Sequence, residues 1–313
     1  MNVRFLETLI CLAKLRNFRQ TAEKLHTTQA SVSNRIASLE QDFGVALFNR
    51  GPVGVALTPE GEKALAHAER IVKLVQNMER DMADNRIVGG TIRIGVIDTI
   101  VHSWLPQFLS RTHQLYPKIS IELTSDTTQN LSEQLQKGNL DLSFQGAAVG
   151  REDMLDTALC SFPMRWVASP MLGVGAGPLE VSDLARFPII SFARGSAPHR
   201  TLLQLFSAPT FESVQIHSMT SVAAMIRLAV EGFGISVLPP AVITDELANQ
   251  RLQVLQLSRP FPDLVLSACH QVAPAHPVIA PLVSLARQVV SDFGQQHGSA
   301  EMLVLPGVVG TAG

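Results

Sequence analysis

Apolar residues recur at helical spacing through the first forty positions of the chain. A helix is predicted over residues 2 to 15. Two shorter helices follow around a tight turn, with one apolar face formed by Phe18, Ala22, Leu25, Val32, Ile36 and Leu39. Thr27 or Thr28 can cap the later helix through a side-chain oxygen. The opposite face of that helix is polar and carries Gln29, Ser33, Asn34 and Arg35. This division favours a DNA-reading helix-turn-helix over an ordinary amphipathic helix pair.

The pattern then changes to short apolar runs around a turn. Gly44 ends the helix, and residues 45–48 and 53–57 flank a turn-rich centre. These runs predict a two-stranded wing, with Arg50 at its tip against the sugar-phosphate backbone or in the minor groove. Thr58 is expected to cap the next helix, with a proline at its first position.

That next helix is long, and its apolar stripe alternates four and three residues apart. It runs from residue 59 to about residue 87, and the stripe consists of Ala64, Ala68, Ile71, Val75, Met78 and Met82. A second copy of the chain could cover this stripe. Packing of the helix on its own domain is the alternative.

A different pattern begins after the glycines at 89 and 90, where apolar strands alternate with amphipathic helices. Strands are predicted at residues 91–96, 119–123, 140–144, 165–168, 189–192, 233–239 and 265–270. Helices are predicted at residues 101–115, 131–136, 198–206, 220–231 and 277–293. The order predicts two similar α/β halves built on parallel sheets.

Composition adds a charge asymmetry to this picture. The chain has 313 residues and a net charge of −2, but residues 1–58 hold seven Lys/Arg and four Asp/Glu, a net of +3. A mildly basic head fits a nucleic-acid-binding module. The sequence contains no signal-peptide pattern and no run of eighteen apolar residues, so we expect a cytoplasmic protein without a membrane partner.

The first sixty residues resemble the LysR-type transcriptional regulators. The resemblance rests on residues 22–26 (AEKLH), 28–33 (TQASVS), 47–50 (LFNR) and 57–61 (LTPEG), together with the Leu39-Glu40 pair and Gly44. Ala30 stands where many relatives carry proline, and Asn34-Arg35 replaces a more usual arginine-then-polar pair, so base preference cannot be transferred.

The resemblance implies an α+α/β architecture with four parts. These are a winged helix-turn-helix at 1–58, a linker or dimerisation helix at 59–88, a periplasmic-binding-protein-like effector domain at 89–294 and a tail at 295–313. The tail is rich in Gly, Val and Ala without a cap or a period, which predicts that it is mobile or loosely packed. The effector domain would divide into one lobe at 91–160 plus 267–293 and another at 161–266. The implied partners are double-stranded operator DNA, a small-molecule effector and other copies of the chain in a dimer of dimers. RNA polymerase is a further candidate. The predicted DNA contacts are Thr28, Gln29, Ser31, Ser33, Asn34, Arg35 and Arg50.

Polar residues that follow predicted strands mark the expected effector site, because ligands bind beyond the carboxyl ends of parallel strands. The candidates are Asp98, Thr99, Thr128, Gln145, Phe192, Arg194 and Ser196, with the resemblance supporting Thr99, Thr128 and the 194–196 loop. The two threonines could instead cap helices, and His199 is expected on a helix surface. The resemblance favours a small organic acid as effector. The charge of Asp98 keeps a neutral or amine-bearing effector open.

The sequence gives no sign of catalysis: we predict no enzyme activity, no catalytic residues, no metal and no cofactor. Nucleophile elbows, metal-spaced His/Cys sets and phosphate-binding glycine loops are missing from it. Two alternatives to an effector-responsive regulator remain. One is a small-molecule binding protein whose head has lost DNA contact. The other is a redox sensor that uses Cys160 and Cys269.

Overall fold

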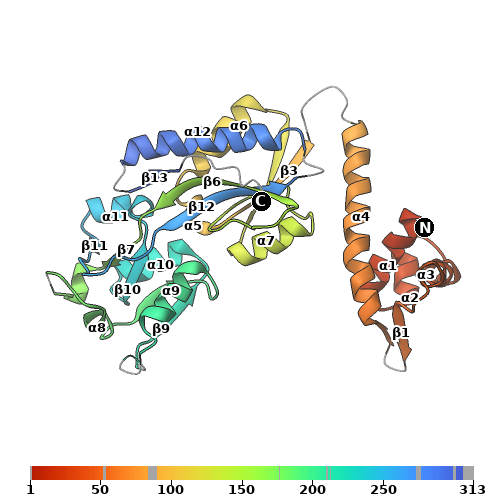
Figure 1. Cartoon of the computed structure of the whole chain (residues 1–313), viewed down its shortest axis with the longest axis horizontal. Coiled ribbons are helices and arrows are strands. Elements are labelled where there is room, and N and C mark those ends of the chain that lie inside the picture. The colour runs from red at the N-terminus through yellow and green to blue at the C-terminus, as the bar shows by residue number, and fades with distance from the viewer. Residues whose placement is uncertain are drawn as a thin grey trace. The chain divides into compact units, whose positions relative to one another are not determined.

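The computed structural model describes residues 2–51, 54–83, 90–175, 177–208, 211, 213–272, 276–298 and 301–305. The chain forms two compact units, Met1–Ile87 and Val88–Gly313, called here the N-terminal and C-terminal units (Figure 1). In the part of the chain that the structure describes, no helix is both long and apolar enough to cross a membrane.

The N-terminal unit contains four helices and a two-stranded sheet among its described residues. They are α1 (Val3–Leu15), α2 (Phe18–Lys24), α3 (Gln29–Phe43), β1 (Phe48–Gly51), β2 (Gly54–Leu57) and α4 (Pro59–Ala83). Side-chain caps set the helix starts: Thr28 accepts a hydrogen bond from Ser31 N at 3.2 Å, and Thr58 accepts one from Gly61 N at 2.9 Å. Gly44, with φ of +70°, ends α3. The predicted caps, helix end and two-stranded wing are therefore confirmed. The first wing strand was predicted at 45–48 but is Phe48–Gly51, and Arg50 pairs with Val55 inside the sheet instead of lying at the tip.

The first half of the stripe on α4 packs against its own unit. Ala68 is 1% exposed and Val72 7% exposed, and they join the core that α1 and α3 form; Ala64 and Ile71 pack against the same core. The core covers Ala68 fully, so for this residue packing within its own unit is the interpretation that holds. Ala64 and Ile71 are only partly buried, and their contact with a partner copy stays a prediction. Val75 is half-buried. The side chains of Met78 and Met82 lie outside the described part of the chain.

The C-terminal unit is built on two mixed sheets (Figure 1). The six-stranded sheet has the order β13 (Leu303–Val304), β6 (Met154–Phe162), β12 (Leu264–Gln271), β5 (Leu142–Gln145), β3 (Gly90–Val96) and β4 (Ile119–Ser125). The five-stranded sheet has the order β11 (Gln253–Val254), β7 (Arg165–Ala168), β10 (Ile235–Leu238), β8 (Ile189–Phe192) and β9 (Ile216–Met219). Within them β3 pairs in parallel with β4 and β5, and β8 with β9 and β10, whereas β12 and β7 pair antiparallel with their neighbours. The expectation of parallel sheets holds for part of each sheet.

We call the six-stranded sheet with its helices the first lobe, and the five-stranded sheet with its helices the second lobe. The helices of the first lobe are α5 (Asp98–Val101), α6 (Leu105–Leu115), α7 (Thr128–Gln136) and α12 (Ile279–His297). Those of the second lobe are α8 (Val181–Leu184), α9 (Ala197–Leu205), α10 (Val222–Val230) and α11 (Thr244–Ala248). The chain passes between the lobes twice, from β6 to β7 and from β11 to β12.

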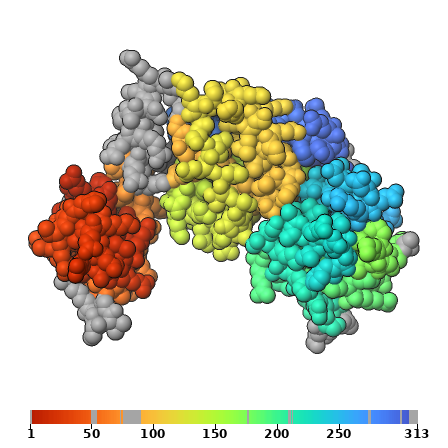
Figure 2. Space-filling view, turned by 180° about the vertical axis from the view of Figure 1, so that it is seen from behind, coloured from red at the N-terminus to blue at the C-terminus, as the bar shows by residue number. Residues whose placement is uncertain are grey.

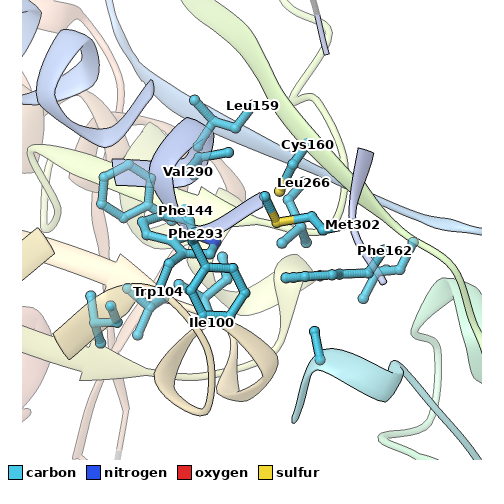
Figure 3. Close-up of a cluster of buried hydrophobic side chains, with 14 of the residues drawn as sticks. Ile100, Trp104, Phe144, Leu159, Cys160, Phe162, Leu266, Val290, Phe293 and Met302 are labelled. Carbon is cyan, nitrogen blue, oxygen red and sulfur yellow. The ribbon is translucent and has the colours of Figure 1, made fainter. Parts of the chain in front are cut away.

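The core of the first lobe is aromatic at its centre (Figure 3). The rings of Trp104 and Phe108 each meet Phe144 edge-to-face, with centroids 5.1 Å apart. Met302 is 2% exposed and lies in the same core, and β13 then pairs with β6. The expectation of a loosely packed tail after Gly294 is therefore wrong for residues 301–305, because an apolar side chain fixes them to the core. Residues 306–313 lie outside the described part.

Candidate functional site

Helix α3 presents a solvent-facing polar surface. Val32, Ile36 and Leu39 are fully buried on its inner face, whereas Gln29 and Asn34 are exposed on its outer face. The period of the helix makes this division, since the buried residues recur at spacings of three and four. The outer face can enter a groove of DNA without disturbing the core.

The other predicted DNA contacts of this region are partly buried or bonded within the protein. The Thr28 hydroxyl caps α3, and Ser31 and Ser33 are half-buried. Arg35 is also half-buried, and its Nη1 donates to the Thr8 hydroxyl of α1 at 3.3 Å. Arg35 thus ties α3 to α1. The backbone of Arg50 lies in β1, and its side chain falls outside the described part.

A carboxylate on α3 fixes the wing. Glu40 accepts hydrogen bonds from the backbone N–H groups of Leu47, at 2.8 Å, and Phe48, at 3.2 Å. Leu47 and Phe48 are buried, so this bridge sets where β1 leaves the core. The Leu39-Glu40 pair belongs to the sequence motif, but the motif alone does not reveal this role.

The C-terminal unit holds a cavity of about 300 Å³ between its lobes. The predicted residues Asp98, Thr99 and Thr128 line it from the first lobe, and Phe192, Arg194 and Ser196 line it from the second. In the space-filling view, the yellow-green surface of the first lobe meets the teal surface of the second (Figure 2). Six of the seven predicted effector residues are therefore brought together around one cavity.

Helix starts from both lobes border this cavity. Helices α5 and α7 begin there from the first lobe, and α9 and α10 from the second. Thr127, Ser196 and Ser221 cap α7, α9 and α10 through their hydroxyl groups. Neither Thr99 nor Thr128 caps a helix, so the alternative that these two threonines are only helix caps is wrong. Thr128 Oγ1 instead accepts a hydrogen bond from Gly146 N at 3.2 Å. Converging helix N-termini favour negatively charged or hydrogen-bond-accepting ligand groups.

The cavity wall also carries charges of both signs. Asp98 and Asp126 contribute carboxylates, and Arg194 and Arg200 contribute guanidinium groups. Asp126 Oδ1 accepts from Thr127 N at 2.7 Å and from Asn130 Nδ2 at 2.8 Å, within its own lobe. An Arg200 Nη donates to the Gly195 carbonyl, which fixes the loop before α9.

Sequence reasoning missed several lining residues, among them Asp126, Arg200, Thr220 and Val222. Asp126 follows a predicted strand and could have been found by the rule that located Thr128. For Thr220 and Val222 a helix start was predicted at residue 220, but the strand before it, β9, was not, so these residues were not placed at the site.

Two sequence expectations in this region are wrong. Gln145 is fully buried and does not line the cavity; its amide donates to Ser132 Oγ and to the Ala147 carbonyl and accepts from Ser143 Oγ. A buried amide whose groups are bonded to protein is structural. His199 is 7% exposed, and its Nδ1 lies 3.0 Å from Ser191 Oγ, so it is no surface residue. Burial, followed by the nearby charge of Arg194, lowers the pKa of His199.

The thiols of this unit are buried and unpaired. Burial raises the pKa of Cys160 to about 12, and burial together with Asp156 raises the pKa of Cys269. Cys269 pairs across the sheet with Asp156, four residues along β6 from Cys160, a separation of about 13 Å. That separation is too large for a disulfide without backbone movement. Among the described residues, no group of three or more His, Cys, Asp or Glu could hold a metal ion.

Known families match both units. The family model of the bacterial regulatory helix-turn-helix protein, lysR family, matches residues 3–62, and the LysR substrate binding domain matches residues 86–291. The chain belongs to the LysR family of bacterial transcriptional regulators. LysR regulators are DNA-binding transcription factors with an effector-binding domain, and they are not enzymes.

Individual LysR relatives share this architecture over most of their length. The chain is 28% identical to the HTH-type transcriptional regulator YofA of Bacillus velezensis over 260 residues, which are 83% of this chain and 88% of that one. It is 26% identical to the hydrogen peroxide-inducible genes activator of Dickeya chrysanthemi over 293 residues, 92% and 95% of the two chains. The structure of full-length LysG from Corynebacterium glutamicum with bound effector Arg matches with a TM-score of 0.67 and 18% identity, covering 93% of this chain and 99% of that one.

Proposed function

We propose that this LysR-family protein binds operator DNA through the outer face of α3 and the wing, and that a small molecule in the cavity between the lobes controls that binding. The observation that carries the proposal is the 300 Å³ cavity, which takes side chains and helix starts from both lobes. A ligand that contacts both lobes favours one arrangement of them over another, and this differential affinity is what a switch requires.

On α3, Asn34 is the proposed base-reading residue, because it is exposed at the centre of the outer face and its amide can pair with adenine. Gln29, Ser31 and Ser33 are proposed as neighbouring contacts. Arg50 is proposed to anchor the wing, and Arg35 to combine a DNA contact with its bond to Thr8.

A gel-shift assay with the DNA upstream of the protein's own gene tests this assignment. Asn34→Ala should weaken the complex about 5- to 100-fold without changing the melting temperature. Gln114→Ala, an exposed amide in the C-terminal unit, is the matched control and should change nothing. Wild-type binding should fall steeply with salt. Equal affinity of wild type and Asn34→Ala would remove α3 as the reading element, and no binding by the wild type would favour a ligand-binding protein without DNA activity.

The effector is proposed to be a small polar metabolite with an anionic group that is received by Arg194, Arg200 and the starts of α7 and α9. LysG, a relative of the same fold, is described with bound arginine, a small amphoteric molecule. Thermal-shift measurements with organic acids and amino acids as probes test this class. A probe that stabilises the wild type should lose its effect in Arg194→Gln and keep it in Arg227→Gln, an exposed arginine outside the cavity. Equal losses in both variants would contradict the assignment.

Two further parts of the proposal concern partners and alternatives. We propose self-association into a dimer of dimers through the exposed part of the α4 stripe, with Ala68 serving the core of its own unit, and a contact with RNA polymerase remains a prediction. The redox alternative loses support, since both thiols are buried and a raised pKa disfavours the thiolate that would attack a peroxide. A bacterial operator lies in the cytoplasm, so the proposed action is cytoplasmic.

A further inference from the structure

A carboxylate of the first lobe bonds to a helix start of the second lobe beside the cavity. Asp98, in the first turn of α5, accepts a hydrogen bond from the backbone N–H of Val222 through Oδ2, at 2.5 Å. Both residues line the cavity. The Asp98 side chain is 23% exposed, and His102 Nε2, one turn further along the chain, lies 3.7 Å from the same oxygen.

The partner of Asp98 is the first residue of a nine-residue helix. Val222 follows the cap Ser221, whose hydroxyl accepts from Ala224 N, so the N–H of Val222 has no acceptor within its own helix. The start of α10 also carries the partial positive charge of the helix dipole. An anion is the favoured occupant of such a position, and in this structure the protein's own carboxylate occupies it.

We propose that Asp98 is a built-in ligand of α10 that clasps the two lobes and sets the charge selectivity of the cavity. The chain connects the lobes by two crossing segments, about which they can rotate, and the Asp98–Val222 bond opposes that rotation from across the cavity. The clasp also fills one of the four helix starts. An effector anion is therefore directed to the Arg194 end, and the group of the effector that faces Asp98 is a hydrogen-bond donor, neutral or cationic.

Hydrogen exchange and anion binding on the full-length protein test the clasp. Asp98→Ala should increase amide exchange at Val222 by about tenfold or more, because the acceptor is gone. The same variant should gain a sulfate-dependent rise in melting temperature, measured against chloride at equal ionic strength, because the start of α10 becomes free for an anion. Asp98→Asn, which keeps an acceptor oxygen but loses the charge, should fall between Asp98→Ala and wild type in both measurements.

Asp126→Ala is the matched control. It removes the same charge from the wall of the same cavity, but the bonds of Asp126 to Thr127 and Asn130 lie within the first lobe. It should leave exchange at Val222 unchanged and gain less from sulfate than Asp98→Ala. Unchanged exchange at Val222 in Asp98→Ala would overturn the clasp, and equal sulfate effects in the two alanine variants would overturn the selectivity. The inference rests on the proposed effector cavity. These measurements use neither DNA nor effector, so their result can be told apart from a failure of the protein to bind operator DNA.

Discussion

Removal of the Glu40 carboxylate is predicted to loosen the wing. Glu40→Ala leaves the N–H groups of Leu47 and Phe48 without their acceptor at the edge of the N-terminal core. A hydrogen bond to a charged group contributes about 1.5–3 kcal/mol when it is buried. Glu40 is half-buried, so water can replace part of the lost interaction, and we expect a loss of about 1.5–3 kcal/mol for the pair together.

The two units can be followed separately because both tryptophans, Trp104 and Trp166, lie in the C-terminal unit. In urea titrations, Glu40→Ala should shift the N-terminal part of the far-ultraviolet circular dichroism transition and leave tryptophan fluorescence unchanged. Glu40→Gln keeps an acceptor oxygen and should lose less than half as much. Gln41→Ala, exposed on the same helix, should stay within about 0.5 kcal/mol of wild type. If Glu40→Ala were as stable as the wild type, the view that this bridge holds the wing would be refuted.

Three further predictions concern the C-terminal unit. Met302→Ala should destabilise it by about 2–5 kcal/mol, because the side chain is buried in the first-lobe core; an unchanged urea midpoint by tryptophan fluorescence would contradict that packing. Cys160 and Cys269 should resist iodoacetamide in the folded protein and react after unfolding, as read by mass spectrometry, since burial raises both thiol pKa values. The pKa of His199 is lowered from its ordinary value of 6.5 in the folded protein, so the unfolded chain binds a proton more readily than the folded chain. Stability should therefore fall as the pH drops through and below 6.5. His199→Gln should make the urea midpoint less dependent on pH between about 7.5 and 5.5, and an unchanged slope would count against this cause.

Local signals explain how much of the fold the sequence could predict. The N-terminal unit was within reach because each of its helices has a cap or a glycine stop next to a strong apolar period, as at Thr28 and Gly44. The buried strand β8 was predicted at its observed bounds because it is a short apolar run. The edge strand β9 is half-buried along its whole length and carries no such run, and it was missed.

Tertiary packing decides the features that local signals do not contain. The stripe of Ala64, Ala68 and Ile71 has a period that fits a partner helix and an intramolecular core equally well. Contact with α1 selects the core for Ala68 and leaves Ala64 and Ile71 partly exposed. Met302 belongs to a segment without helical or strand period, and its order comes from one side chain inserted into a distant core. Neither outcome follows from spacing, because spacing gives the face of a helix and not the surface that covers it.

Asp98 shows how one missing strand changes the interpretation of a binding site. In the sequence, its negative charge conflicts with a cavity for organic acids, and nothing places the helix start predicted at residue 220 opposite it. Once β9 is in place, α10 begins opposite α5, and the N–H of Val222 supplies the counter-group from the other lobe. The charge of Asp98 is then directed at the helix start and is partly compensated there, which leaves the arginine end of the cavity to an effector anion. The residue that weakened the organic-acid hypothesis thus becomes the reason to expect an effector with an anionic group at one end and a hydrogen-bond donor at the other.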